Sequence, residues 1–280
     1  MTPDRQKQLA ETFRRAHRAP PLLLLPNAWD AMSARQFEAA GFPAIATTSG
    51  GVAWDLGFAD GEQAPWGEIV AATERIVRAV RVPVTADIEA GYGETPEQVG
   101  KSIGEILRTG VAGFNLEDGT PRPDMPVRPI EDAVARIRAA RQAADAAGVN
   151  AVINGRIDLY LKNVGDPASR FDETVRRAEA YLAAGADCIY PFGFIDMETI
   201  ARLTKAIRAP INIVARAGTP PVAELERAGI ARVTIASGAT LAVMSLIKKI
   251  GTDLRATGKF DGLEHSMNRP EAQKLFEARE

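Results

Sequence analysis

Short apolar runs alternate along the chain with longer stretches in which apolar residues recur every three or four positions. The runs are continuous rather than alternating with polar residues, as is typical of strands buried on both faces of a parallel sheet. Most follow a helical stretch that ends in Ala-Gly or Thr-Gly, the common cap of a helix C-terminus. Two follow a proline instead, at Pro83 and Pro210. The pattern predicts strands at Leu22–Leu25, Ala44–Ala46, Val84–Asp87, Gly113–Leu116, Ala151–Ile153, Cys188–Tyr190, Ile211–Asn212 and Arg232–Ile235.

Eight strand–helix units predict an α/β protein built as a closed (β/α)8 TIM-type barrel. An open doubly wound sheet is the alternative, but no Gly-x-Gly-x-x-Gly follows the first strand. We expect an N-terminal helix over 4–18 before the barrel. After it, the apolar stretch Ala239–Ile250 and a final helix over 270–278 form a C-terminal helical extension, 240–280. The whole chain, 1–280, is expected to be a single domain whose extension packs on a partner subunit.

Composition adds mainly exclusions. The 280 residues are 46% hydrophobic and 25% charged, and the net charge of −2 gives no bulk attraction to nucleic acid or to an anionic membrane. No apolar run approaches the length of a membrane span. The single cysteine, Cys188, excludes a disulfide framework and a cysteine-based zinc site and is expected to be a small core residue. We therefore expect a cytoplasmic protein. The two histidines, His17 and His265, fall outside the strand ends and are expected to face solvent.

The third strand ends in the first candidate site. Asp87 closes the apolar run, and Glu89 follows two positions later, before Gly91-Tyr92-Gly93. Two carboxylates at the exit of a buried strand are costly unless a cation is present. Mg²⁺ suits them, because it takes oxygen ligands and is often held by one or two carboxylates and several waters. The alternative interpretation is a strand followed by a solvated acidic turn.

Polar residues also follow the other strands. In a barrel, the carboxyl ends of the strands form the active site, so acidic residues after strands three and four and an arginine after strand five predict a cation pocket beside an anion pocket. Backbone N–H groups after strand two could bind a carboxylate, although that segment could also be only a turn. The arginine could instead only pair with Asp158. The candidates are Thr48, Ser49, Gly50, Gly51, Glu117, Arg156, Tyr190 and Asn212.

With these residues in place, the chain resembles the isocitrate lyase and phosphoenolpyruvate mutase superfamily over roughly residues 20–240. The resemblance rests on five segments: Thr48-Ser49-Gly50, Leu56-Gly57-Phe58-Ala59-Asp60, Ala86–Gly93, Leu116–Gly119 and Gly155–Asp158. It implies an α/β barrel, a Mg²⁺ site that Mn²⁺ could also fill, a small 2-oxo acid as substrate or product, and a helix-swapped homodimer or homotetramer.

The resemblance also assigns roles. Asp87 is similar to the direct metal ligand of the family, and Asp60, Glu89 and Glu117 to outer carboxylates that act partly through water. Ser49 with the Gly50–Gly51 backbone resembles the carboxylate cradle, next to Thr48. Arg156 resembles the anion clamp.

The loop after strand four departs from the family pattern. The lyases carry a Cys there as acid/base, within Lys-Lys-Cys-Gly-His, whereas the segment 119–129 has no Cys, His or Lys. The mutase and phosphonopyruvate hydrolase carry a longer loop with Lys and a Thr-Asn pair, and the mutase has a His where this chain has Tyr190-Pro191. Isocitrate cleavage and mutase chemistry are therefore both disfavoured. The residues that resemble the metal-binding and oxo-acid-binding residues of the family are still present.

These features predict a Mg²⁺-dependent lyase or decarboxylase that acts on an oxaloacetate-like 2-oxo acid through a metal-stabilised enolate. Arg156, Glu117 and Tyr190 are the candidate catalytic residues, with Tyr190 or a metal-bound water as proton donor. Arg122, in a proline-rich lid from Pro121 to Pro129, is expected to contact the substrate anion, and Asn212 to bind substrate. Two alternatives stay open: a phosphonopyruvate hydrolase or mutase-like P–C bond enzyme that uses Arg122, and a non-catalytic barrel that senses an oxo acid.

Overall fold

The computed structural model describes residues 1–18, 20–193, 195–264 and 266–277. Strands and helices alternate along the chain, as the apolar pattern predicted. The strands are β1 Leu23–Leu25, β2 Asn27–Ala28, β3 Ile45–Thr47, β4 Val84–Asp87, β5 Gly113–Glu117, β6 Val152–Ile157, β7 Cys188–Pro191, β8 Asn212–Val214 and β9 Arg232–Thr234. The helices are α1 Pro3–Ala16, α2 Ala31–Ala39, α3 Ser49–Asp55, α4 Trp66–Ala79, α5 Pro96–Arg108, α6 Ile130–Ala146, α7 Arg170–Ala184, α8 Met197–Ala206, α9 Val222–Arg227, α10 Gly238–Thr257 and α11 Arg269–Phe276.

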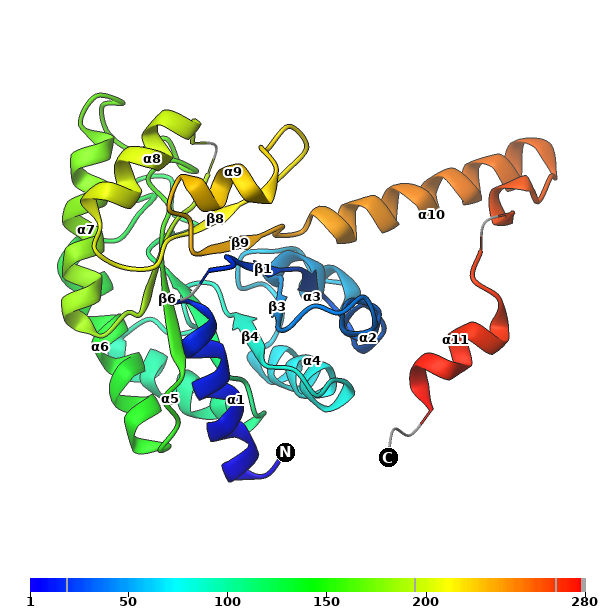
Figure 1. The fold of residues 1–280 in the computed structure, drawn as a ribbon, viewed down its shortest axis with the longest axis horizontal. Coiled ribbons are helices and arrows are strands. Elements are labelled where there is room, and N and C mark those ends of the chain that lie inside the picture. The colour runs from blue at the N-terminus through cyan, green and yellow to red at the C-terminus, as the bar shows by residue number, and fades with distance from the viewer. Residues whose placement is uncertain (19, 194, 265, 278–280) are drawn as a thin grey trace.

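The strands form a closed ring of parallel neighbours (Figure 1). One sheet has the order β2-β3-β4-β5-β6-β7 and the other β1-β9-β8. Because β1 and β2 flank Pro26, they are two parts of one barrel strand, and a parallel bridge between Ile189 and Ile211 connects β7 to the β8 side. The predicted (β/α)8 barrel is confirmed.

Local sequence signals explain where the barrel helices begin. The Thr95 hydroxyl accepts the Gln98 N–H, Gln98 caps in return, and Pro96 occupies the first turn of α5. Asp196 caps α8 through the Thr199 N–H at 2.8 Å. The apolar faces of both helices are buried against the barrel, including Ile103 of α5.

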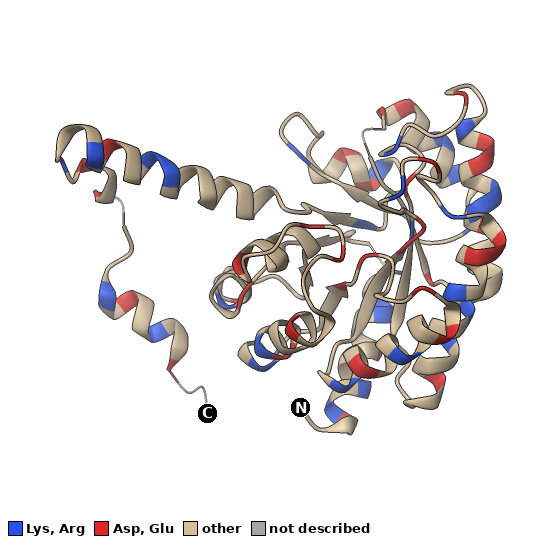
Figure 2. Cartoon of the chain, turned by 180° about the vertical axis from the view of Figure 1, so that it is seen from behind, with Lys and Arg blue, Asp and Glu red and all other residues tan. Residues whose placement is uncertain are grey.

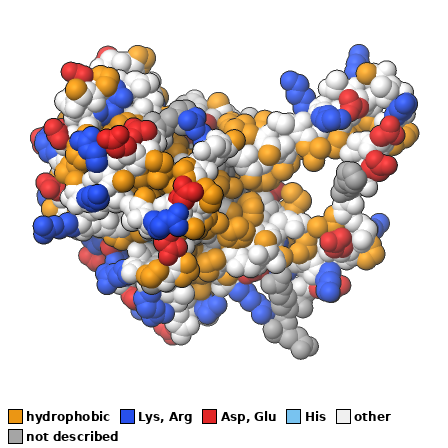
Figure 3. All heavy atoms as spheres, turned by 45° about the horizontal axis from the view of Figure 1, so that its top comes forward, with side chains coloured by type: hydrophobic (Ala, Val, Ile, Leu, Met, Phe, Trp, Pro, Cys, Tyr) orange, Lys and Arg blue, Asp and Glu red, His pale blue; other side chains and the backbone are white. Residues whose placement is uncertain are grey.

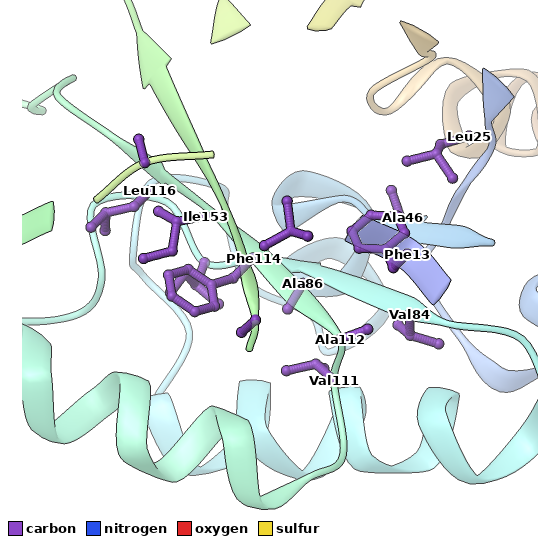
Figure 4. Close-up of a cluster of buried hydrophobic side chains, with 14 of the residues drawn as sticks. Phe13, Leu25, Ala46, Val84, Ala86, Val111, Ala112, Phe114, Leu116 and Ile153 are labelled. Atoms are coloured by element: carbon purple, nitrogen blue, oxygen red, sulfur yellow. The ribbon is translucent and has the colours of Figure 1, made fainter. Parts of the chain in front are cut away.

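Helix α1 closes the amino-terminal end of the barrel. Phe13 is fully buried in a cluster with strand residues such as Leu25, Ala86 and Phe114 (Figure 4). The expectation that His17 faces solvent was wrong: its ring stacks edge-on against Phe13 at 4.6 Å and is buried. Burial, together with the nearby charge of Arg232, lowers the pKa of His17 to about 4. His265 lies outside the described residues.

Helix α10 leaves the barrel as an extended arm (Figure 1). Of its residues only Thr240 is buried. Hydrophobic side chains gather where it leaves the barrel and continue along it (Figure 3), and its barrel-proximal half carries no charged residue (Figure 2). After the arm, α11 returns beside α2, where the Arg35 guanidinium lies 5.9 Å from the ring centre of Phe276. None of the helices described is long and apolar enough to cross a membrane.

Candidate functional site

Three predicted site residues lie side by side at the carboxyl ends of adjacent strands. The register of β5, β6 and β7 pairs Glu117 with Arg156 and Arg156 with Tyr190. The Arg156 Nη1 atom lies 2.7 Å from Glu117 Oε2, an ion pair without hydrogen-bond geometry. The same guanidinium donates to Asp158 from Nε at 2.6 Å and from Nη2 at 3.0 Å. Its planar face lies on Phe192, with Cζ 3.9 Å from the ring centre. The pairing with Asp158, which the sequence left open as an alternative, is present together with the ion pair to Glu117.

The electrostatics of this unit favour a charged arginine among several carboxylates. Burial alone would lower the pKa of Arg156, but the charges of Asp158 and Glu117 outweigh it and hold that pKa above its ordinary value. Burial raises the pKa of Glu117 well above its usual range, against the attraction of Arg156, and the nearby charges of Asp158 and Asp87 raise it further. One arginine thus faces three carboxylates, and the site has an excess of negative charge.

Asp87 ends β4 with one oxygen unused. Its Oδ2 accepts the Ser49 N–H at 3.2 Å, and its own N–H donates to Thr47 Oγ1 at 2.8 Å. The other oxygen, Oδ1, is buried and has no hydrogen-bond partner among the described residues. A buried carboxylate oxygen without a donor is costly, so this atom is where a cation would be stabilised.

Glu89 sits next to Asp87 but is already bound by the protein. Both of its carboxylate oxygens accept the Glu62 N–H, at 2.9 Å each, and Oε1 also accepts the Tyr92 hydroxyl at 3.2 Å. Burial raises the pKa of Glu89 to about 7, with the carboxylates of Asp60 and Asp87 adding to the rise. The backbones of Glu62, Glu89 and Tyr92 all have positive φ, a conformation that non-glycine residues adopt at some energetic cost and often at functional sites.

Asp60 completes the acidic side of the site. Burial followed by repulsion from Asp87 raises the pKa of Asp60, while the nearby Ser49 side chain and Gly61 backbone act against that rise. Across the described part of the chain, no three His, Cys, Asp or Glu side chains converge closely enough to hold a metal by themselves. Mg²⁺ does not require such a cage, since it often keeps several waters. Asp87 as direct ligand, with Asp60, Glu89 and Glu117 acting through water, fits this donor set and stays a prediction.

The segment from Thr48 to Gly51 begins helix α3 and is not merely a turn. The Thr48 hydroxyl lies 2.7 Å from the Ser237 hydroxyl, which joins the ends of β3 and β9. A Cβ on Gly50 would lie 3.1 Å from Asp60 Oδ2, and one on Gly51 would lie 2.6 Å from Thr48 Cγ2. Close packing therefore requires a glycine at position 51, and a side chain at position 50 would crowd the Asp60 carboxylate. The N–H groups of both glycines lie in a first helical turn that has no acceptors within the helix.

Two predicted site residues are not brought to the open site. Asn212 is fully buried, because its side chain enters the barrel interior, where its Oδ1 accepts a 3.4 Å hydrogen bond from Thr234. Arg122 pairs instead with Asp124 on the same loop, at 2.7 Å, and 60% of its side chain is exposed.

Tyr190 is buried beside the site, and its hydroxyl is 3.0 Å from Thr234 Oγ1. Burial raises the pKa of Tyr190, so its phenol stays protonated.

The loop after β5 folds as a small hairpin, with Gly119 bridged to Val127. Beneath it lies a residue whose role sequence reasoning missed, Asp118. Its Oδ1 accepts the Asp158 N–H at 2.9 Å, and its Oδ2 accepts from Arg177 at 2.9 Å and from the Tyr181 hydroxyl at 2.6 Å. Asp118 thus fixes the backbone at Asp158, which in turn holds Arg156. Its place in Glu117-Asp118-Gly119 was the available signal, but its partners on α7 lie about 60 residues away in sequence.

The chain is similar to one protein family model, to relatives of known sequence and to solved structures. A family model described as phosphoenolpyruvate phosphomutase matches residues 13–255. An uncharacterized protein of Mycobacterium tuberculosis is 34% identical over 81% of this chain and 82% of its own length. Among solved structures, a putative phosphonomutase from Burkholderia cenocepacia is 43% identical, with a TM-score of 0.83 over 88% of this chain and 99% of that one. A putative lyase/mutase from the same organism is 33% identical, with a TM-score of 0.92 over 99% and 98%.

Relatives with named activities are more distant. A 2-methylisocitrate lyase of Salmonella typhimurium is 28% identical over 89% of this chain and 85% of its own length. Oxaloacetate decarboxylase 2 of Pseudomonas putida is 29% identical over 71% and 64%. The relatives thus include lyases and decarboxylases with different substrates.

Proposed function

Because the chain belongs to the phosphoenolpyruvate phosphomutase family, within the isocitrate lyase and phosphoenolpyruvate mutase superfamily, we propose that it is a Mg²⁺-dependent carbon–carbon lyase acting on a small 2-oxo acid. One observation carries the proposal: the unpartnered, buried Oδ1 of Asp87 lies at the same barrel end as the Arg156–Glu117 pair. A cation site next to a guanidinium is the arrangement that a carboxylate with an adjacent keto group requires.

The proposed substrate orientation follows from the donors. The substrate carboxylate is placed at the first turn of α3, where Ser49, Gly50 and Gly51 begin the helix. Its keto oxygen faces Arg156, whose guanidinium is held rigidly by Asp158 and Phe192. When bound, Mg²⁺ would act as a Lewis acid toward the carboxylate and keto oxygens.

In the proposed reaction, the bond between the departing carboxylate and the carbon next to the keto group breaks. CO₂ leaves, the electron pair becomes an enolate, and Arg156 stabilises the developing negative charge. The enolate carbon is then protonated to give the shorter 2-oxo acid. Tyr190 is our candidate donor, because its phenol is protonated and lies on the strand next to Arg156. This decarboxylation needs no Cys, His or Lys on the loop after β5.

The proposal is tested by a substrate screen on the native protein and on the Asp87→Ala variant. Pyruvate release from oxaloacetate and methyl-substituted oxaloacetates is followed with Mg²⁺ and with EDTA, and Mn²⁺ binding is measured separately by calorimetry. We expect EDTA-sensitive turnover in the native protein and a loss of at least about 10³-fold, with lost Mn²⁺ binding, in Asp87→Ala. Asp145→Ala, an exposed carboxylate on α6, is the control. Full activity of Asp87→Ala would refute the metal assignment.

A P–C bond enzyme is the second candidate, favoured by the 43% identity to a putative phosphonomutase. The same screen therefore includes phosphonopyruvate. Release of inorganic phosphate, without pyruvate from any oxaloacetate, would replace the lyase proposal. Mg²⁺-dependent binding of oxo acids without turnover would instead favour the sensor.

We further propose that α10 packs on a second copy of the chain in a helix-swapped homodimer or homotetramer. Five large apolar residues of this one helix are exposed, with Leu246 at 54% and Ile247 at 63%, and α10 buries little against its own barrel. Light scattering after size exclusion is expected to give a dimer or tetramer. Leu246→Glu with Ile247→Glu is expected to give monomers, whereas Lys248→Glu, on the same helix, is the control. A native monomer would contradict the proposal.

A further inference from the structure

A largely apolar pocket opens beside the proposed site, at the carboxyl ends of β7, β8 and β9. It encloses about 750 Å³. Its apolar walls include Trp54, Leu161, Phe192, Val214, Ile235 and Leu241, and Arg216 is the one charged residue among the described residues that line it. Pockets of this size accommodate small organic ligands, and a predominantly apolar lining selects an apolar group.

The pocket shares two walls with the proposed site. Phe192 lines the pocket and also stacks on the Arg156 guanidinium at 3.9 Å. Ser237 lines it as well, and its hydroxyl contacts Thr48 at 2.7 Å, directly before the proposed carboxylate cradle. A molecule whose polar head is held between the cradle and Arg156 can therefore extend into this pocket.

The opposite side of the site has a different character. A second pocket, of about 860 Å³, lies between the Tyr92 loop and the hairpin after β5, and charged residues line it: Glu62, Glu94, Arg122 and Arg128. An apolar substituent directed there would desolvate these charges without pairing them. The apolar pocket is the side on which such a substituent is stabilised.

We propose that the substrate is a 2-oxo acid with an apolar substituent larger than methyl, a branched alkyl chain or a phenyl group, and that this substituent occupies the pocket at β7–β9. The inference rests on the proposed function for the polar head of the substrate. Oxaloacetate itself would leave the pocket unfilled, so we expect its turnover to be slower than that of an oxaloacetate that carries such a substituent.

The test measures binding of a graded series of 2-oxo acids by calorimetry in the presence of Mg²⁺. The probes are pyruvate, 2-oxobutanoate, 2-oxopentanoate, 2-oxo-4-methylpentanoate and phenylpyruvate. Burial of each added methylene is expected to tighten Kd by roughly fourfold. Ala217→Phe places a ring in the pocket from an exposed loop position, so it is expected to abolish most of the preference for long chains. Val222→Phe, on exposed α9 outside the pocket, is the matched control and should keep the full preference.

The outcomes separate this inference from the proposed function. Mg²⁺-dependent binding of pyruvate with equal Kd values across the series overturns the inference and leaves the proposed function intact. Absence of binding for every 2-oxo acid, pyruvate included, refutes the proposed function as well. A change in oligomeric state in Ala217→Phe, with the chain-length preference unaltered, would assign the pocket to a subunit contact and overturn the inference.

Discussion

The two halves of the open barrel end differ in chemistry. At β4, β5 and β6, the strand ends carry Asp87, Glu117 and Arg156, which are held by hydrogen bonds or an ion pair, while Asp87 Oδ1 has no partner among the described residues. At β7, β8 and β9, the residues that follow the strands are mostly apolar, and they line a pocket. The difference suggests a division of roles, in which the charged half determines the reaction and the apolar half determines which substrate enters it.

This division follows from how each half is held. In the charged half, adjacent strands fix the register of Glu117, Arg156 and Tyr190, and Asp118 fixes the backbone at Asp158. A substitution there changes the geometry of charges at the reacting atoms. In the apolar half, the walls come mostly from loops, with Trp54 from α3 and Leu241 from α10, and they provide mainly apolar surface. A substitution there should shift preference between substrates more than the rate for any one of them.

Among charge-conserving variants of the charged half, we expect Arg156→Lys to lower kcat/KM the most. A lysine retains one positive charge but cannot donate twice to Asp158, face Glu117 and stack on Phe192 at once. We expect kcat/KM for the best substrate to fall by about 10³-fold, a loss of about 4 kcal/mol in transition-state stabilisation. Steady-state kinetics measures it. Arg122→Lys, an exposed arginine, is the control, and a loss below tenfold in Arg156→Lys would contradict the assigned role.

The free energy of unfolding should depend on pH through His17, a residue that lies outside the charged half. Burial lowers the pKa of His17 to about 4, whereas the unfolded chain binds this proton near pH 6.5. Stability is therefore fully present above pH 6.5 and falls between pH 6.5 and 4, by about 3 kcal/mol in total, as the unfolded state takes up the proton. Urea denaturation across this range measures the slope. In His17→Phe the part of the slope that is due to His17 should vanish, and an unchanged slope would refute the assignment.

Tyr190→Phe tests the boundary between the two halves. The tyrosine lies next to Arg156 in the register, while its ring packs edge-on against Phe192 at 5.1 Å. If its phenol protonates the enolate, kcat should fall by roughly tenfold to a hundredfold with little change in KM, because the ring shape is kept. Thr234→Val, which removes the hydroxyl partner of Tyr190, is the comparison and should have a smaller effect. Equal kcat in Tyr190→Phe would leave a water as the donor.

Much of the charged half was predictable because it depends on strand ends. Continuous apolar runs predicted the strands, and residues at or just after the end of a run lie at the active face of a barrel, as Asp87 and Glu117 do at the last positions of β4 and β5. Arg156 lies one residue before the end of β6, which extends beyond the predicted strand Ala151–Ile153. Asn212 differs, because it begins β8 instead of ending it and its side chain is buried inside the barrel. Its role in substrate binding stays a prediction. The burial of His17 depends on helix α1 closing the other barrel end, which no local pattern reveals.

The apolar half could not be predicted. Its pocket is lined by residues after β7, β8 and β9 together with Trp54 from the end of α3, and these segments have no shared periodicity. Single apolar residues in loops are common and carry no signal on their own. Only the closed ring of strands brings them together. The apolar stretch of α10 was foreseen, and its packing on a partner subunit stays a prediction.

Arg122→Ala is the variant from which we expect the smallest effect. The sequence placed this arginine at the substrate, whereas the structure pairs it with Asp124 on the hairpin, exposed to solvent. An exposed pair of this kind contributes little, so kcat/KM should stay within about threefold of the native value, and thermal stability should not change measurably. Asp124→Ala, which releases the guanidinium from its partner, tests whether a free Arg122 would turn to the site. A loss above tenfold in Arg122→Ala would show that the hairpin closes over the substrate during turnover and would assign the charged pocket a direct role in substrate binding.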